Sequence, residues 1–321
     1  MSAQLFLAPM AGVTNTVFRR LCKGFGADVL TTEFVSAEGI LHRNERTRRY
    51  LEFHPDERPL GVQLFGADPD RLAEAARAVI DWVAPDFIDL NFGCPVNKVV
   101  CKNGGSSLLR DCPLLARVAE SVARAAAPVP VTAKIRIGWD TRSINAIDTS
   151  RVLETAGIQR ITVHGRTKEQ GYSGEADWHT IAAVANAVSI PVIGNGDVSN
   201  AAQATERLRQ SGVAGLMIGR AAMNHPWIFS EIRQVLNGAP PPPPPSPTQQ
   251  WDFILDHCAR EIDWWQGKEQ LALKAMRARL MAYSRGMPGG PRLREKLQHV
   301  ESLADVRHIA DVFLAANTPL T

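Results

Sequence analysis

The stretch GVQLFGADPDRLAEAARAVIDWVAPDFIDLNF, residues 61–92, contains a complete strand–helix–strand unit. Both ends of this stretch are short apolar runs, which is typical of strands buried on both faces. Between them, residues 68–83 place alanine, leucine and valine at three- and four-residue spacing, which predicts an amphipathic helix. Asp68 followed by Pro69 is typical of a helix N-cap with proline at the first helical position. Two strands joined by a helix predict a parallel pair.

The same alternation recurs along the chain. Six further apolar runs occupy residues 5–10, 29–34, 131–138, 160–165, 191–196 and 214–219. Helical spacing returns between them, for example in residues 112–127. Eight such units in succession predict a closed (β/α)8 TIM barrel. The alternative is an open doubly wound sheet, but no GxGxxG motif follows the first run, which disfavours a dinucleotide-binding fold.

A proline run divides the chain. Residues 238–248 read GAPPPPPPSPT, a composition that favours polyproline II geometry and a stiff spacer. A proline-rich ligand for another domain is the alternative. Helical patterns follow at residues 251–265, 270–285 and 303–316. We therefore predict a catalytic barrel over residues 1–238, a linker over 239–248 and a small C-terminal helical domain over 249–321.

The composition excludes several classes of protein. Hydrophobic residues make up 45% of the 321 residues and charged residues 21%, as in ordinary soluble globular proteins. The net charge of +3 permits an anionic partner without requiring one. The five cysteines form no CxxC pair and no zinc-like cluster with histidine, so we expect neither disulfides nor a metal. With no signal peptide and no window of about 20 apolar residues, a cytoplasmic location without membrane contact is expected.

Polar and glycine residues collect where the predicted strands end. In a parallel barrel the carboxyl ends of the strands meet at one rim, and active sites lie there. Asn195-Gly196-Asp197 and Gly219-Arg220 end the seventh and eighth runs, after which such barrels commonly bind phosphate. Glycine lets backbone N–H groups approach an anion, and Arg220 can donate two hydrogen bonds to it. Ordinary turn chemistry is the alternative, but two such motifs on neighbouring strands favour a phosphate site.

Three side chains at this rim carry chemistry. Lys134 lies within an apolar run, where a charge needs a ligand or a carboxylate partner, and we favour the ligand. His164 ends the sixth run and is equally consistent with a structural role. Cys94 follows the fourth run and could be a nucleophile, a metal ligand, a general acid or an inert residue. No metal-ligand partners accompany it, and a thiol with an ordinary pKa of about 8.5 is mostly protonated at neutral pH, which suits a proton donor.

Six motifs together resemble the tRNA-dihydrouridine synthase family. They are APMAGVTNTVFRRLC (8–22), NFGCP (91–95), KIRIGWD (134–140), HGRTKEQGY (164–172), GNGDV (194–198) and MIGRAAMNHPWIF (217–229). The resemblance covers essentially the whole chain, and the Asn-x-Gly-Cys-Pro loop is the hallmark of the family. It implies an FMN-dependent (β/α)8 barrel that uses NADPH to reduce uridine in tRNA to 5,6-dihydrouridine.

The resemblance also implies a role for each matching residue. Cys94 falls on the proton-donating cysteine, whereas Cys101 in the same loop receives no role. The positions that flank the isoalloxazine ring fall on Pro9, Met10, Ala11, Gln63 and Lys134. The other FMN-binding positions fall on His164, Asn195, Gly196, Asp197, Gly219 and Arg220. Substrate contacts are expected from Asn91, Lys134 and Arg166. The reaction needs hydride at C6 and a proton at C5, while Lys134 and Asn91 stabilise charge on the uracil carbonyl oxygens.

A tRNA partner requires a basic docking surface, because the target uridine must leave a folded RNA to reach the barrel. Residues 268–296 contain eight lysines and arginines against two glutamates, and we expect Arg277 and Arg279 among them to bind substrate. Residues 43–49 are a second candidate. A solvated charged face is the alternative for either run.

The predicted function is therefore NADPH-dependent, FMN-mediated reduction of a specific uridine of tRNA, in the D-loop as the family implies, by a monomer. One alternative is a flavin-dependent reductase of a free pyrimidine, which the basic helical segment disfavours. A second is a flavin-free, phosphate-binding isomerase or lyase. A third is a non-catalytic tRNA-binding barrel, which the presence of Cys94, Asn91 and Lys134 disfavours.

Overall fold

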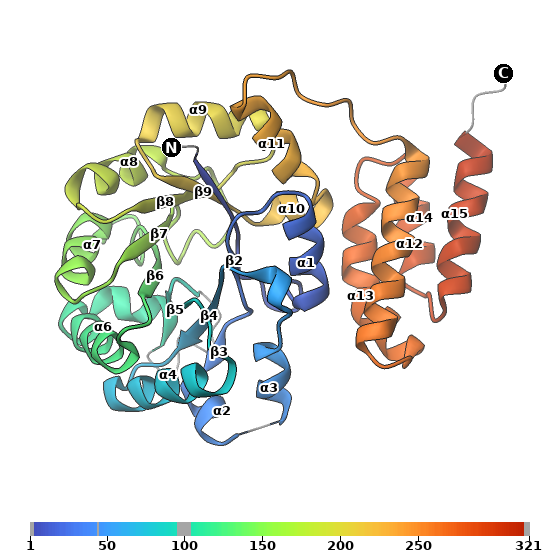
Figure 1. Cartoon of the computed structure of the whole chain (residues 1–321). Coiled ribbons are helices and arrows are strands. Elements are labelled where there is room, and N and C mark those ends of the chain that lie inside the picture. The colour runs from blue at the N-terminus through green and yellow to red at the C-terminus, as the bar shows by residue number, and fades with distance from the viewer. Residues whose placement is uncertain (1–2, 44, 95–103, 318–321) are drawn as a thin grey trace.

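The computed structural model describes residues 3–43, 45–94 and 104–317. Within these ranges, parallel strands form one nine-stranded sheet that curls into a barrel (Figure 1). The strands are β1 (Gln4–Leu7), β2 (Leu30–Thr31), β3 (Val35–Ser36), β4 (Leu60–Phe65), β5 (Phe87–Phe92), β6 (Val131–Arg136), β7 (Arg160–His164), β8 (Val192–Asn195) and β9 (Gly215–Ile218). Their order is β1-β9-β8-β7-β6-β5-β4-β2, and β3 pairs with β4.

The ring closes between β1 and β2. Phe6 and Val29 form a parallel bridge there, and the Leu7 N–H donates to the Val29 carbonyl at 3.1 Å. Helices cover the outside: α1 (Thr16–Gly24), α2 (Ala37–Leu41), α3 (Glu45–Leu51), α4 (Pro69–Val83), α6 (Cys112–Ala126), α7 (Ala146–Thr155), α8 (Trp178–Ala187), α9 (Ala201–Ser211), α10 (Arg220–Asn224) and α11 (Ile228–Leu236). Short 3-10 helices occupy Pro55–Glu57 and Gly105–Arg110. The predicted (β/α)8 TIM barrel is confirmed.

The strand–helix–strand unit that predicts the fold has the expected local structure. Asp68 caps α4, and its side chain accepts hydrogen bonds from the amides of Asp70 and Arg71, both at 3.0 Å. The buried face of α4 consists of Leu72, Ala73, Ala75, Ala76 and Val79, at the three- and four-residue spacing that the sequence shows.

One predicted strand is broken. The run at residues 29–34 forms only β2, and β3 begins after it, because Thr32 makes hydrogen bonds of its own. Its hydroxyl donates to the Glu33 carbonyl at 3.0 Å and accepts from the Gln63 N–H at 3.2 Å. The break leaves the buried Glu33 carboxylate to accept a hydrogen bond from the Gly12 N–H at 2.6 Å.

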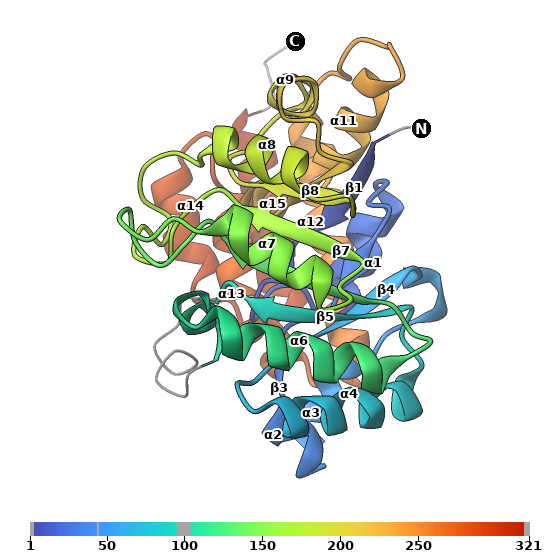
Figure 2. The ribbon, with the colours of Figure 1, turned by 90° about the vertical axis from the view of Figure 1, so that its left-hand side faces the viewer.

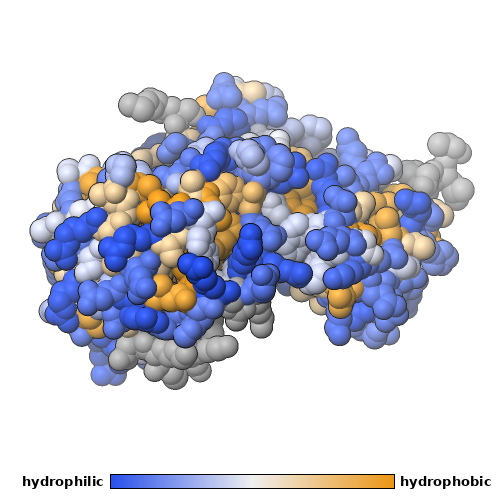
Figure 3. Space-filling model, turned by 60° about the horizontal axis from the view of Figure 1, so that its bottom comes forward, coloured by the Kyte–Doolittle hydropathy of each residue, from blue (hydrophilic) through white to orange (hydrophobic). Residues whose placement is uncertain are grey.

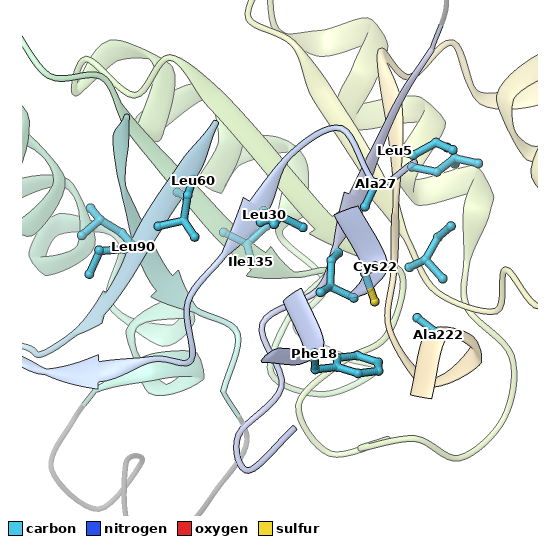
Figure 4. Packing of buried hydrophobic residues seen from close by; sticks show 14 of the residues in the cluster. Leu5, Phe18, Cys22, Ala27, Leu30, Leu60, Leu90, Ile135 and Ala222 are labelled. Atoms are coloured by element: carbon cyan, nitrogen blue, oxygen red, sulfur yellow. The ribbon is translucent and has the colours of Figure 1, made fainter. Parts of the chain in front are cut away.

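Apolar side chains fill the amino-terminal half of the barrel interior. This inner cluster consists of Phe6, Ala8, Val29, Phe87, Ile193 and Met217. The Arg160 guanidinium lies over the rings of Phe6 and Phe87, at 4.9 and 4.6 Å from their centroids. Alternate residues of the same strands, such as Leu5 and Leu7, point outward into the larger core under the helices. In that larger core, Figure 4 shows Phe18 and Cys22 of α1 close to Ala222 of α10.

After the barrel the described chain is helical. The elements are α12 (Pro247–Trp264), α13 (Glu269–Tyr283), α14 (Gly290–Leu297) and α15 (Leu303–Asn317). The sequence predicted three of these helices but not α14, because its first turn contains glycine and proline. The linker was expected to end at residue 248, but α12 already begins at Pro247. Ser246 and Gln249 form a reciprocal capping box there, which starts the helix earlier.

The proline run connects α11 of the barrel to α12 of the C-terminal helices (Figures 1 and 2). Ala239, Pro242 and Pro245 are less exposed than the prolines between them. A burial period of three residues is that of a polyproline II helix, which has three residues per turn. The run therefore touches the protein along one edge.

The C-terminal helices pack against the barrel beside the neighbouring strands β1 and β9. Helix α12 contacts α1, which follows β1, and α13 contacts α10, which follows the neighbouring strand β9. The Phe253 ring of α12 lies 5.8 Å from the Phe25 ring, and the His257 ring lies 5.9 Å from the Phe18 ring. In Figure 3 the barrel and the helices appear as two lobes with largely hydrophilic surfaces. No helix in the described ranges is long and apolar enough to cross a membrane.

Candidate active site

A cavity of about 850 Å³ opens at the carboxyl ends of the barrel strands. This volume lies within the range of small-molecule sites, and the location is the one expected of an active site in a TIM barrel. The apolar inner cluster forms its floor, because Ala8 and Met217 belong to both. A ligand would therefore rest on an apolar surface and be held by polar strand ends.

The structure brings together the residues that the sequence predicts to bind the cofactor and to donate the proton. The cavity is lined by Pro9, Met10, Ala11, Gln63, Asn91, Cys94, Lys134, His164, Asn195, Gly196, Asp197, Gly219 and Arg220. They come from seven of the nine strands or from the loops that directly follow them. Their individual roles remain predictions.

A chain of buried hydrogen bonds fixes the turn that carries Cys94. The Oδ1 atom of Asn91 accepts hydrogen bonds from the backbone N–H groups of Gly93 and Cys94, at 3.1 and 2.8 Å. The Nδ2 atom of Asn91 donates to Oε1 of Gln63 at 2.8 Å, and Gln63 in turn donates to Asp89 at 2.7 Å. The Cys94 carbonyl accepts from the Ser106 hydroxyl at 2.9 Å. Cys94 is thus held from both sides, with its side chain buried at the cavity wall.

Lys134 and Arg136 place two cations beside Cys94. They are two residues apart on β6 and therefore point to the same side of the strand. Burial, followed by the charge of Arg136, lowers the pKa of Lys134 from 10.5 to about 8, although Asp89 and Cys94 oppose this shift. Arg136 is anchored by the carbonyls of Gly93, Thr167 and Gly171, at 2.8 to 2.9 Å. A thiolate formed at Cys94 would be stabilised by both positive charges.

Asp197 organises the other end of the cavity. It adopts a positive φ of 50°, and its carboxylate accepts two hydrogen bonds from Arg166, at 2.9 and 2.8 Å. Arg220 donates to the same carboxylate at 2.9 Å, and the Ala176 N–H donates at 2.7 Å. Although burial opposes it, the hydrogen bonds from Arg166 and Ala176 lower the pKa of Asp197. The carboxylate therefore stays ionised and holds Arg220 at the rim.

The cavity is electropositive. Burial and the charges of Lys134, Arg136, Arg166 and Arg220 hold the pKa of His164 far below its usual value, so its imidazole is neutral near pH 7. Among the described residues, the lining contains four cationic side chains, those of Lys134, Arg136, Arg220 and Arg285, against one carboxylate, that of Asp197. Such a balance favours an anionic ligand.

Sequence reasoning missed some residues of the lining. The sequence places Arg136 on the same predicted strand as Lys134, but no role was assigned to it. Tyr172 lies on the loop between β7 and α8, 60% exposed, with its ring 6.3 Å from that of His164 and 4.9 Å from the Arg220 guanidinium. Arg285 follows α13 and reaches the cavity from the C-terminal helices. Only the tertiary arrangement reveals that contribution.

Three predicted substrate residues do not line the cavity. Arg166 is buried behind it and holds Asp197. Arg277 is half-buried and donates to the Val300 carbonyl at 2.9 Å. Arg279, expected in an exposed docking patch, is instead buried at 5% exposure, which corrects that expectation. The patch was defined by counting charges along the chain, whereas Arg279 shares the inward face of α13 with Met276 and Leu280.

Of the predicted patch at residues 268–296, Lys268, Lys274, Arg285, Arg292 and Lys296 are exposed. Of the patch at residues 43–49, Arg43, Arg48 and Arg49 are exposed. Cys101 lies outside the described residues. Among the residues that the structure describes, no cluster of histidine, cysteine or carboxylate side chains could hold a metal ion.

Known proteins share the fold of this chain and a large part of its sequence. A solved structure, "Crystal structure of TcOYE with pHBA", superimposes with a TM-score of 0.54 over 73% of this chain and 89% of that one, at 11% identity, which shows a shared fold alone. The chain is 41% identical over 298 residues to tRNA-dihydrouridine synthase B of Pseudomonas aeruginosa, which covers 93% of this chain and 89% of that protein.

A second relative, from Rickettsia conorii, is named probable tRNA-dihydrouridine synthase. The chain is 39% identical to it over 295 residues, which covers 92% of this chain and 88% of that protein. The family model described as dihydrouridine synthase (Dus) matches residues 6–317 and thus spans both the barrel and the C-terminal helices. The chain therefore belongs to the dihydrouridine synthase family.

Proposed function

We propose that this protein reduces a specific uridine of tRNA, in the D-loop, to 5,6-dihydrouridine, with FMN bound in the cavity and NADPH as the reductant. The observation that carries the proposal is the position of Cys94. Its thiol shares one electropositive cavity with Lys134, Asn91 and the predicted cofactor residues. The names of the relatives from Pseudomonas and Rickettsia support the same activity.

The residues present fit FMN. Arg220, held at the rim by Asp197, would bind the phosphate together with the backbone around Gly196 and Gly219. A β-carbon on Gly196 would lie 2.6 Å from the Cβ of Ala176, so only glycine fits at this position of the cavity wall. Met10 and Ala11 would contact the flavin ring. Bound FMN would supply the hydride that no side chain can donate.

Cys94 would act as a general acid towards C5 of the uracil. The hydrogen bonds from its amide to Asn91 and from Ser106 to its carbonyl fix the backbone that carries the thiol. When the proton leaves, the charges of Lys134 and Arg136 stabilise the sulfur anion. At neutral pH Lys134 is mostly protonated, since its pKa is about 8.

Lys134 and Asn91 would bind the uracil carbonyl oxygens. Within the described residues, the Asn91 amide uses one of its two N–H groups, on Gln63, so the other can donate to substrate. Charge that builds on a carbonyl oxygen during reduction would strengthen both contacts, which lowers the barrier to reaction. The same groups would hold the base in place while the proton moves.

Residues at and near the rim of the cavity would provide docking contacts for a substrate as large as tRNA. A uridine leaves the stacked RNA at a cost of a few kcal/mol, which contacts elsewhere on the tRNA must offset. Arg285 stands at the cavity wall, and further exposed lysines and arginines lie on α13 and α14. Under this proposal the C-terminal helices dock the tRNA through its phosphates.

The first test is the visible absorption spectrum of the purified protein under anaerobic conditions, with and without NADPH. We expect a flavin spectrum that bleaches with NADPH and recovers on addition of unmodified tRNA, but not of free uridine. A protein without flavin that also fails to bind added FMN would refute the proposal. Recovery with free uridine alone would instead favour a reductase of free pyrimidines.

Cys94→Ala separates the two half-reactions. The variant should retain flavin and its reduction by NADPH, yet lose the formation of dihydrouridine. Cys112→Ala is the matched control, because Cys112 lies on the outer helix α6 and not at the cavity. Equal turnover of tRNA by Cys94→Ala and by the control would remove Cys94 from the mechanism.

A further inference from the structure

The loop that connects β1 to α1, residues 8–15, is held by side chains from outside it. Ala8, Pro9, Met10, Ala11 and Val13 line the cavity. Within the loop, the Met10 N–H donates to the Thr14 hydroxyl at 2.9 Å. From outside, Glu33 accepts the Gly12 N–H at 2.6 Å. The conformation of this part of the cavity wall thus depends on a few polar contacts.

The C-terminal helices supply the opposing contact. Arg279 of α13 donates through Nη2 to the Val13 carbonyl at 2.6 Å and to the Gly12 carbonyl at 3.4 Å. The amide of Gly12 and its carbonyl are therefore held by oppositely charged side chains, Glu33 from the barrel and Arg279 from the helices. This arrangement fixes the peptide planes next to Met10 and Ala11.

Arg279 is itself held by Glu261 of α12. Nη1 of Arg279 donates to Oε1 of Glu261, and the same oxygen accepts from Nδ2 of Asn15 at 2.7 Å. His257 lies 3.5 Å from this oxygen. Asn15 is the N-cap of α1, so Glu261 contacts the far end of the same loop. Arg279 and Glu261 together therefore grip residues 12–15 from the helical side.

The ion pair is almost completely withdrawn from water, with exposures of 5% for Arg279 and 1% for Glu261. Buried ion pairs contribute little net stability compared with apolar side chains of the same size. Two of their polar atoms, Nε of Arg279 and Oε2 of Glu261, have no hydrogen-bond partner within the described structure. The pair lies against the loop that lines the cavity. Its contribution is therefore to hold this loop in place rather than to raise the stability of the fold.

We propose that Arg279 and Glu261 are positioning residues for the cofactor: the C-terminal helices clamp the β1–α1 loop so that Met10 and Ala11 form the wall against which FMN rests. This inference rests on the proposed binding of FMN in the cavity. It assigns the helices a second task besides tRNA docking, and it explains why Arg279 is buried rather than exposed in the basic patch.

The test compares Arg279→Lys with Arg260→Gln in the full-length chain. Lysine keeps the charge beside Glu261, but its single ammonium cannot reproduce the fork that spans Glu261 and the two loop carbonyls. Arg260 is an exposed residue of α12 whose guanidinium pairs with Asp256 on the same helix, which makes it a matched control. FMN affinity is measured by flavin fluorescence after removal of bound flavin, without NADPH or tRNA.

We expect Arg279→Lys to weaken FMN binding about tenfold, as loss of a charged hydrogen bond would. Hydrogen exchange of a peptide covering residues 8–18 should accelerate, and the visible circular dichroism of bound FMN should change. The affinity for tRNA and the exchange of α15 should match the control. A docking role for Arg279 would show the reverse pattern, with weaker tRNA binding and unchanged FMN binding, and would overturn the proposal.

A second variant guards against a general loss of folding. Arg279→Met combined with Glu261→Met removes both buried charges and so leaves neither unpaired. This double variant should fold and still bind FMN more weakly than the control. FMN affinity equal to that of the control, in either variant, overturns the clamp while leaving the proposed function intact. A wild-type chain that binds no FMN overturns both.

Discussion

Replacing Lys134 by methionine should remove a fall in activity that the native protein shows above about pH 8. Burial, followed by the charge of Arg136, lowers the pKa of Lys134 from 10.5 to about 8. The ammonium group is then roughly nine-tenths protonated at pH 7 and roughly one-tenth protonated at pH 9. Because the proposed reaction uses this charge at a uracil carbonyl oxygen, kcat/KM should decline around that pKa.

The size of the effect follows from the contact that is lost. A hydrogen bond to a charged group contributes roughly 1.5–3 kcal/mol. Lys134→Met should therefore lower kcat/KM at pH 7 by about 10- to 150-fold. The residual activity should no longer decline near pH 8. Lys134→Arg, whose guanidinium stays charged throughout this range, should move the decline to higher pH.

The assay follows dihydrouridine formation in unmodified tRNA from pH 6 to pH 10, under anaerobic conditions with saturating FMN. The affinity for tRNA is measured separately over the same range, so that a change in docking is not taken for a change in chemistry. Ionisation of the Cys94 thiol would also reduce activity at high pH. The rate of its alkylation by iodoacetamide, measured at each pH, reports that ionisation directly.

A decline with the same midpoint in native protein and in Lys134→Met would refute the reasoning. The titrating group would then be another one, and agreement with the alkylation profile would identify it as Cys94.

The stability of the fold offers an independent check, in which the effect of pH has the opposite sign to its effect on activity. The folded pKa of Lys134 lies below its unfolded value, so the unfolded state binds more protons between about pH 8 and 10.5, and this residue should make stability rise with pH in that window.

Three further changes test the other parts of the site. Arg285→Ala should weaken tRNA binding and reduce its salt slope by about one, with unchanged FMN affinity; an unchanged slope removes Arg285 from the docking surface. Asp197→Asn should destabilise the fold by about 2–3 kcal/mol in denaturant unfolding, because buried Arg166 loses its ionised partner. The lowered pKa of Asp197 means that its contribution is complete above about pH 4 and is lost as pH falls through the folded pKa, so a stability difference that does not shrink as the pH is lowered below about 4 contradicts this account. Gly196→Ala should lower FMN affinity and cost about 2 kcal/mol, since φ is +131° and the new Cβ would meet Ala176; normal FMN binding would show that this wall can yield.

The residues of the cavity could be anticipated from the sequence because topology leaves them little choice. Once the strands of a barrel are parallel, their carboxyl ends must meet at one rim, whatever the details of packing. Cys94, Lys134 and Arg220 are far apart in the chain, yet each lies near the carboxyl end of a strand or just after it, and all line the same cavity. Identifying the strands was therefore enough to assemble the site, and the motifs supplied the roles to be tested.

Residues outside the strand ends could not be anticipated in the same way. Arg279 looks like one of several cations in a basic run, and only the packing of α13 on the barrel reveals that it faces inward. Arg285 lies six positions later and reaches the cavity. A charge count treats the two alike, because it contains neither the rotation of the helix nor the surface against which it packs. The break after β2, which frees Glu33 to hold Gly12, depends on the hydroxyl of Thr32 and is equally invisible in a hydropathy pattern.

The attachment of the C-terminal helices to the two barrel helices that follow β1 and β9 connects these two groups of residues. Helix α12 packs on α1, which follows the loop of Met10, and α13 packs on α10, which follows Gly219. Both loops line the cavity, one where the flavin ring is proposed to rest and the other where its phosphate would bind. A movement of the helices relative to the barrel would therefore displace both ends of the cofactor site. Docking of tRNA on the helices and retention of FMN in the barrel should accordingly be coupled, and each ligand should tighten the binding of the other by the same factor.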